Sequence, residues 1–264
     1  MTYLKAVRFD RVARLPSGYP FNIPAVATLE RIEFRAPVTL FAGENGTGKS
    51  TLLEGIAAGI ESISVRADDP LTERTLTPTT ELGRQLRFEW STKTRRGFFL
   101  RAEDFFDFTK RISQLTRELE TLAAEFDERL TGYGRQLARG TALGQRRTLL
   151  EKYGEDLNAR SHGESFLQFF RARFTGPGVY LLDEPDTALS PQSVLGLMAM
   201  LIDLVREGAQ LIIATHSPML MALPGATIIS FDRAPVAEVA YDQVEQIELM
   251  RTFLNRPEAF LRHL

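Results

Sequence analysis

Residues 43–50 read GENGTGKS, a glycine-rich pattern whose residue types and spacing suit the binding of a nucleotide phosphate. The pattern follows an apolar stretch, Val38–Ala42, and opens a helical one, which favours a phosphate-binding loop over a glycine turn that merely caps a helix. Glycines let the backbone turn tightly enough for several N–H groups to converge on a phosphate, and the helix dipole adds to the attraction. We expect Lys49 to reach the β- and γ-phosphates and Ser50 to bind Mg²⁺. The expected nucleotide-binding residues of this segment are Gly43, Glu44, Asn45, Gly46, Thr47, Gly48, Lys49, Ser50 and Thr51.

A pair of carboxylates follows a second apolar stretch, in the sequence VYLLDEPD at residues 179–186. Asp183 is placed to enter the Mg²⁺ shell through a water molecule, and Glu184 to polarise the water that attacks the γ-phosphate in line. The alternative is two solvated carboxylates at the end of a strand. The phosphate-binding pattern, with Lys49 lying 134 residues upstream of Asp183, makes that alternative the weaker one.

A histidine ends a third apolar stretch, because Leu211–Ala214 is followed by Thr215 and His216. A histidine at a strand end is often only a polar cap. This strand can lie beside the strand of Asp183, so we expect the His216 imidazole to hydrogen-bond the γ-phosphate and hold the attacking water.

The segment SHGESF at residues 161–166 has two interpretations that are compatible. Ser161 and Glu164 form a capping box, which stabilises the start of the helical pattern Glu164–Phe174. Ser161 and Gly163 also present a hydroxyl and close backbone N–H groups, an anion site that could hold the γ-phosphate of a nucleotide bound elsewhere.

The elements that must position these residues are strands that alternate with helices, which predicts an α/β fold with a largely parallel sheet. The predicted strands are Leu4–Phe9, Val38–Ala42, Leu86–Trp90, Phe98–Leu100, Val179–Leu182, Leu211–Ala214 and Thr227–Phe231. The predicted helices are Lys49–Ile60, Glu164–Phe174, Pro191–Arg206 and Val244–Leu254.

Apolar residues at steps of three or four from Phe108 to Leu130 predict a further amphipathic helix. Residues 131–148 contain several glycines and no acid, so we expect a flexible basic loop there, with arginines at Arg135, Arg139, Arg146 and Arg147. The proline- and threonine-rich stretch Asp69–Thr80 is expected to be a surface loop.

The C-terminal stretch Val244–Leu264 predicts two short helices separated near Pro257. We expect both to pack on the core, and their apolar anchors would be Leu249, Phe253, Phe260 and Leu261.

The amino-acid composition excludes several classes of protein. The 264 residues are 44% apolar and 25% charged, which excludes a disordered or collagenous chain. The net charge of −2 gives no overall basic field of the kind that a dedicated nucleic-acid-binding protein has. The absence of cysteine excludes disulfides and thiolate metal sites and fits a reducing cytoplasm. The longest apolar-rich stretch, Val194–Val205, is far shorter than the ~20 residues of a membrane span, so we expect a soluble protein that does not insert into a membrane.

From about Tyr19 onward, the chain resembles the ATP-binding cassette (ABC) ATPase superfamily, which has a glycine-rich loop, a serine-glycine helix start, an Asp-Glu pair and a strand-end histidine in this order and at these intervals. Within that superfamily it resembles in particular the small stand-alone bacterial members, described as AAA-type or ABC-type ATPases. The resemblance implies a P-loop α/β domain over residues 1–264, with an antiparallel β portion and a helical subdomain at 104–175 that carries the signature motif. It also implies that two subunits pack head to tail around two ATP molecules, so that Ser161 and Gly163 act on the nucleotide of the partner. The loop Ala188–Ser190 would cross that interface. Phe21 is the expected adenine-stacking aromatic, with Tyr19 as its competitor.

The chain also departs from the family pattern. The usual signature is LSGGQ, and here Arg160, His162 and Glu164 replace three of its five residues. The strand-end glutamine that ABC enzymes use to touch Mg²⁺ and to couple to a partner is not evident, since GFFLRAE at 97–103 offers Leu100, Arg101 or Glu103. Coupling to the membrane domain of a transporter is therefore disfavoured.

These residues predict an Mg²⁺-dependent ATPase, and the resemblance implies that it forms a homodimer with ATP and couples the cycle to an unidentified macromolecular or protein partner. Three alternatives stay open. The first is a DNA- or RNA-associated ATPase, for which the arginines of residues 131–148 are the local support. The second is the nucleotide-binding subunit of a transporter, and the third is a switch that binds ATP without turnover.

Overall fold

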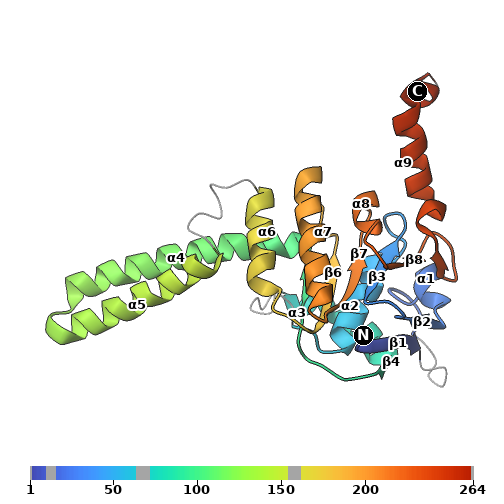
Figure 1. Cartoon of the computed structure of the whole chain (residues 1–264). Helices are drawn as coiled ribbons and strands as arrows, with labels where there is room; N and C mark the ends of the chain where they lie inside the picture. The colour runs from blue at the N-terminus through green and yellow to red at the C-terminus, as the bar shows by residue number, and fades with distance from the viewer. Residues whose placement is uncertain (1, 10–15, 64–71, 154–161, 263–264) are drawn as a thin grey trace.

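The computed structural model describes residues 2–9, 16–63, 72–153 and 162–262 of the chain (Figure 1). Its main sheet has six strands in the order β5-β6-β7-β3-β8-β9. All neighbours in this sheet pair in parallel except β8 and β9. The strands are β3 (Val38–Ala42), β5 (Phe99–Arg101), β6 (Val179–Asp183), β7 (Gln210–Ala214), β8 (Thr227–Ser230) and β9 (Ala237–Val239).

A second, antiparallel sheet has three strands in the order β2-β1-β4. Its strands are β1 (Leu4–Phe9), β2 (Arg31–Glu33) and β4 (Leu86–Trp90), and a short helix, α1 (Pro24–Ala27), precedes β2. The two sheets and their helices confirm the predicted α/β fold with a mostly parallel sheet and an antiparallel portion.

Alternating side chains of the main sheet face two apolar clusters. Tyr180 and Leu182 belong to one cluster, together with buried residues of α6 (His162–Arg173), α7 (Pro191–Arg206) and α8 (Pro218–Met221). Leu181 belongs to the other, together with α2 (Lys49–Gly59) and the antiparallel sheet. Because successive side chains of a strand point to opposite faces, strands covered on both sides are apolar throughout, as β3, β6 and β7 are.

Helix α3 (Thr72–Gln85) lies where the proline- and threonine-rich stretch predicts a surface loop, so that prediction is wrong for residues 72–80; residues 69–71 lie outside the described part. The helix packs against α2. A Cβ atom on Gly83 would come within 2.8 Å of the carbonyl oxygen of Gly55, so glycine permits this close approach. Packing of the buried Leu82 against α2 outweighs the turn propensity of the sequence.

Helices α4 (Ala102–Arg129) and α5 (Gly132–Tyr153) form a long antiparallel hairpin, hereafter the α4–α5 hairpin, which projects from the body (Figure 1). The helix predicted from Phe108 is confirmed, but the flexible loop predicted at 131–148 is helix α5. The glycines in this segment led to the wrong prediction. They do not mark turns: a Cβ atom at Gly134, Gly140 or Gly144 would meet nothing within 4 Å, so these positions do not require glycine and fit an exposed helix surface. Helix α5 packs on α4 with Leu119, Ala123 and Ala142 buried, and exposed ion pairs between the two helices add to this contact.

The C-terminal helices are α9 (Glu245–Asn255) and α10 (Pro257–Leu261), which follow a short 3₁₀ helix, η1 (Tyr241–Gln243). Their break at Pro257 confirms the predicted separation. The expected packing on the core holds only at the start of the segment, where Val244 and Ile247 belong to the buried core. It is wrong for the expected anchor Leu249, which is 59% exposed, and the rest of α9 stands away from the body (Figure 1). Phe253 and Phe260 pack on each other instead, 5.6 Å apart between ring centres. In the described part of the chain, no helix combines the length and apolar content that crossing a bilayer requires.

Candidate active site

The carboxyl ends of three neighbouring parallel strands bring the predicted site residues together. The loop after β3 carries residues 43–48, β6 ends at Asp183 and Glu184, and β7 is followed by His216. The order β6-β7-β3 places these ends side by side. A cavity of about 1210 Å³ opens there, and its lining includes Asn45, Gly46, Gly48, Lys49, Ser50, Thr51, Asp183, Glu184 and His216.

The backbone of the loop after β3 requires glycine. Gly46 and Gly48 have φ angles of 80° and 101°, in the left-handed region that favours glycine. A Cβ atom on Gly48 would lie 2.7 Å from the Cγ2 atom of Ile23. Gly48 is the N-cap of α2 and carries no side chain, so the first N–H groups of α2 can face a phosphate instead of a capping group.

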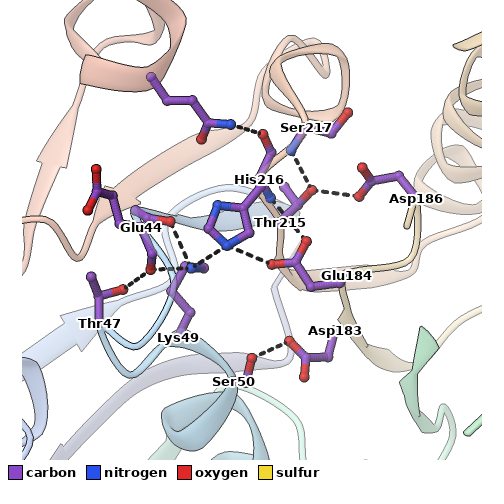
Figure 2. A network of polar contacts seen from close by, with 12 residues as sticks. Glu44, Thr47, Lys49, Ser50, Asp183, Glu184, Asp186, Thr215, His216 and Ser217 are labelled. Carbon is purple, nitrogen blue, oxygen red and sulfur yellow. Dashed lines mark hydrogen bonds and ion pairs between the residues drawn. The ribbon is translucent and has the colours of Figure 1, made fainter. Parts of the chain in front are cut away.

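Lys49 is buried, and burial lowers the pKa of its ammonium group. Its Nζ donates hydrogen bonds to the carbonyl oxygens of Gly43 at 2.7 Å and Glu44 at 2.8 Å, and lies 3.0 Å from Nε2 of His216 (Figure 2). The ammonium group is therefore held over the glycine loop, where the phosphates of a nucleotide would lie.

Ser50 and Asp183 offer two adjacent oxygen ligands for a metal ion. The Ser50 Oγ donates a hydrogen bond to Oδ1 of Asp183 at 2.8 Å (Figure 2). Burial raises the pKa of Asp183, although the hydrogen bond from Ser50 and the charge of Arg101 oppose that shift. Among the described residues, no group of three or more His, Cys, Asp or Glu side chains could hold a metal alone. This donor set fits Mg²⁺, which binds proteins through one or two oxygen ligands and takes the rest from phosphates and water.

Glu184 has a φ angle of 49°, which is rare for a residue other than glycine and typical of strained functional sites. Its carboxylate accepts a hydrogen bond from the backbone N–H of His216 at 3.2 Å and lies 3.3 Å from the His216 Nε2. Burial raises the pKa of Glu184 to about 7. A base with a pKa near the working pH combines the required protonation state with a strong tendency to accept a proton.

His216 is held by its backbone and by its ring. Gln246 of α9 donates a hydrogen bond to the His216 carbonyl oxygen at 2.7 Å. Burial, followed by the charge of Lys49, lowers the pKa of the imidazole, so the ring is neutral at pH 7. Its contacts with Lys49 and Glu184 are both made by Nε2, which in a neutral ring either accepts a hydrogen bond from the Lys49 ammonium or, in the other tautomer, donates one to Glu184, so the ring can bond only one of these partners at a time (Figure 2).

Three residues that hold the site together were not predicted from the sequence. Thr215 donates a hydrogen bond to Asp186 at 2.7 Å, which ties the segment after β7 to the segment after β6 (Figure 2). Asp232 accepts a hydrogen bond from the backbone N–H of Glu44 at 2.8 Å and steadies the glycine loop. Asp186 is visible in the sequence as the last residue of DEPD, but the partners of these side chains come from distant segments.

The expected adenine-stacking role of Phe21 is not supported. Phe21 is only 6% exposed and packs with Phe9 in the apolar cluster that also contains α2. Its competitor Tyr19 is 61% exposed, lines the cavity and places its hydroxyl 3.4 Å from the Thr51 Oγ1. Tyr19 is therefore the aromatic ring of this segment that can meet a bound base.

The expected trans-acting residues are only partly described. Ser161 lies outside the described residues, and Gly163 falls in the first turn of α6. The predicted interface loop Ala188–Ser190 leads into α7, where the Ser190 Oγ caps the helix by accepting from the backbone N–H of Ser193 at 3.2 Å. The action of Ser161 and Gly163 on a partner's nucleotide stays a prediction.

Two family models match the chain. One, described as an AAA domain, matches residues 22–85. The other, described as an AAA domain, putative AbiEii toxin, Type IV TA system, matches residues 98–222. Together they cover the glycine loop, the acidic pair and the histidine.

The chain is also similar to an ABC transporter and to ATP-binding parts of ABC transporters. It is 26% identical over 193 residues to the ABC transporter G family member STR2 of Medicago truncatula, an alignment that spans 69% of this chain but only 24% of that protein. It is 18% identical to cbiO1 from Clostridium perfringens, part of the ABC transporter complex cbiONQ, with 99% of both chains covered and a TM-score of 0.44. It is 15% identical to a nucleotide-free ATP-binding cassette from an ABC transporter, with 96% of both chains covered and a TM-score of 0.48.

Proposed function

We propose, on the premise that the chain is an ABC-type P-loop ATPase, that its cavity binds ATP with Mg²⁺ and hydrolyses ATP to ADP and phosphate. One observation carries the proposal: Lys49, Glu184 and His216 come from three separate strand ends and meet in one cavity. A merely structural cluster would have no need of a strained carboxylate beside a glycine loop.

In the proposed reaction, the oxygen of a water molecule attacks the γ-phosphorus, the bond to the β,γ-bridging oxygen breaks, and the water proton passes to Glu184. Lys49 exchanges its two backbone carbonyl contacts for phosphate oxygens, and His216 hydrogen-bonds the γ-phosphate. Bound at Ser50 and Asp183, Mg²⁺ would neutralise charge on the β- and γ-phosphate oxygens.

Release of phosphate from ATP tests this proposal, and Lys49→Ala serves as the control that excludes a contaminating ATPase. Hydrolysis by the wild-type chain that is lost in Lys49→Ala supports the proposal. Equal rates for the two proteins would contradict it.

We further propose that two chains close head to tail around two ATP molecules, so that Ser161 and Gly163 of each chain contact the nucleotide of its partner. The resemblance to ABC ATPases supports this arrangement. Glu184→Gln should bind ATP without hydrolysing it and accumulate as a dimer with saturating ATP and Mg²⁺, as measured by light scattering. A variant that binds ATP yet stays monomeric would count against the dimer and leave the ATPase proposal standing.

The cycle would drive an unidentified macromolecular partner, and the projecting α4–α5 hairpin is the element best placed to contact one (Figure 1). The nucleic-acid alternative loses its local support, because Arg135 and Arg139 both pair with Asp127 of α4 and Arg146 pairs with Glu120. We expect ATP hydrolysis at low salt to be unchanged by single- or double-stranded DNA, and a salt-sensitive rise would revive that alternative.

A second candidate is the nucleotide-binding domain of a transporter, which the sequence similarity to the ABC transporter STR2 favours. Copurification of the chain with a membrane protein would support it. The cytoplasmic location expected from the absence of cysteine stays a prediction.

A further inference from the structure

Arg101 is the only arginine among the described residues that line the candidate active-site cavity, and it contacts the expected metal ligand. The guanidinium Nε donates to Oδ2 of Asp183 at 3.3 Å, while Ser50 occupies Oδ1 of the same carboxylate. The register of the sheet places the two residues together, because Arg101 of β5 pairs directly with Asp183 of β6. Parallel partners in register share one face of a sheet, so this contact follows from the fold.

The other end of the guanidinium contacts a second buried carboxylate. Arg101 Nη2 forms an ion pair with Glu54, whose side chain is only 7% exposed. Glu54 lies four residues after Ser50 on α2, so both side chains lie on the same face of that helix. Thr79 of α3 hydrogen-bonds Glu54, so α3 helps to hold this carboxylate in place.

A guanidinium on Asp183 and Mg²⁺ on the same carboxylate repel each other, since both are cations within a few ångströms in a poorly solvated site. Glu54 offers Arg101 an alternative partner that is already in contact with it. A planar guanidinium with several donors can bridge two carboxylates and then keep only one of them.

We propose that Arg101 is a positioning residue that competes with Mg²⁺ for Asp183, and that Glu54 holds its guanidinium when the metal binds with ATP. This inference rests on the proposed binding of ATP and Mg²⁺. Helix α4 begins at Ala102, so a movement of Arg101 acts on the first turn of the α4–α5 hairpin.

The test measures how strongly Mg²⁺ and nucleotide assist each other's binding. The affinity for a fluorescent, non-hydrolysable ATP analogue is measured with saturating Mg²⁺ and with EDTA, and the ratio of the two affinities is the metal coupling ratio. No catalytic turnover enters this readout.

The proposal predicts opposite changes for two substitutions. Arg101→Gln removes the competitor and should raise the metal coupling ratio by about tenfold, whereas Glu54→Gln leaves the guanidinium on Asp183 and should lower the ratio by about tenfold. Arg31→Gln is the matched control, because it removes an exposed arginine from β2, and the ratio should stay within about twofold of the wild-type value.

Arg101→Gln alone leaves two buried carboxylates without their cation, which could prevent folding. The double variant Arg101→Gln/Glu54→Gln removes a cation and an anion together and so avoids this cost. Its ratio should equal that of Arg101→Gln, because Glu54 acts only through Arg101. A general electrostatic contribution of Glu54 would instead lower the ratio equally in both backgrounds.

Changes of the same sign in the two single variants, or ratios unchanged in both, would overturn the inference. Failure of the wild-type chain to bind the analogue at all would overturn the proposed function itself. Folding of each variant is checked by circular dichroism, so that a loss of binding is not mistaken for a change in coupling.

Discussion

Arg101 and the arginines of the α4–α5 hairpin form ion pairs in regions that differ in burial. Arg101 is 28% exposed and meets two carboxylates that are almost fully buried. Arg135 and Arg139 are each 51% exposed and share the exposed carboxylate of Asp127. Water and salt screen the second group, whereas the first group lies where an unpaired charge is costly. The same residue type is therefore part of a buried charge cluster in one region and of weak, exposed ion pairs in the other.

Lys49→Ala should have the largest effect, because Lys49 lies in the buried region and no other described ammonium group faces the glycine loop. We expect ATP hydrolysis to fall by about 100-fold or more, since the substitution removes a charge aimed at the phosphates. Nucleotide affinity, measured by fluorescence, should fall with it. ATP hydrolysis by Lys49→Ala at close to the wild-type rate would mean that the buried charges of the cavity matter no more to activity than the exposed charges of the hairpin.

The dependence of kcat/KM on pH should reveal the titration of the half-buried Glu184 carboxylate. Its pKa is raised to about 7, and the base must be deprotonated to accept a proton. The value of kcat/KM should therefore rise by about tenfold between pH 6 and pH 8 and then level off. A profile that is flat over this range, or falls with rising pH, would argue against Glu184 as the base.

Gly83→Ala should weaken the packing of α3 on α2, because the added Cβ meets the backbone of Gly55 at 2.8 Å. We expect the free energy of unfolding to fall by about 1–3 kcal/mol in urea denaturation. Gly140→Ala in α5 is the matched control, because its Cβ meets nothing within 4 Å and alanine favours a helix by up to about 1 kcal/mol. Equal changes in the two variants would mean that α3 does not pack closely on α2.

Arg139→Gln in the hairpin should have the smallest effect. An exposed ion pair contributes at most about 1 kcal/mol, so the free energy of unfolding should change by less than that, and ATP hydrolysis should stay at the wild-type rate.

Arg101→Gln provides the contrast in stability, because it leaves two buried carboxylates without their cation and should lower the free energy of unfolding by about 3–5 kcal/mol. Similar losses in both variants would contradict the difference in burial.

Local patterns in the sequence predicted seven of the nine strands in the described part of the chain and the cluster of candidate site residues, but they missed the short edge strands β2 and β9. Apolar stretches that end in a glycine loop, in Asp183 and in His216 predicted three strands whose carboxyl ends meet, and these strands are neighbours. The glycine loop after β3 was also predictable from the pattern GENGTGKS, and the left-handed backbone angles of Gly46 and Gly48 agree with the need for glycine there.

The errors arose where contacts between distant segments override local preference. Glycines in α5 and Pro78 within α3 suggested loops, yet packing against α4 and against α2 keeps both segments helical. Phe21 and Tyr19 are equivalent in the sequence, and only burial separates them. The contact of Arg101 with Glu54 joins residues 47 positions apart, and no local pattern contains it.

The central claim is that Glu184 accepts a proton from the attacking water in a cavity that binds ATP. The most direct measurement combines ATP binding and ATP hydrolysis in Glu184→Gln, which keeps the shape of the side chain and removes its basicity. We predict that affinity for ATP stays within about threefold of the wild-type value while kcat falls by at least about 100-fold. A variant that binds ATP and hydrolyses it at the wild-type rate would contradict the account.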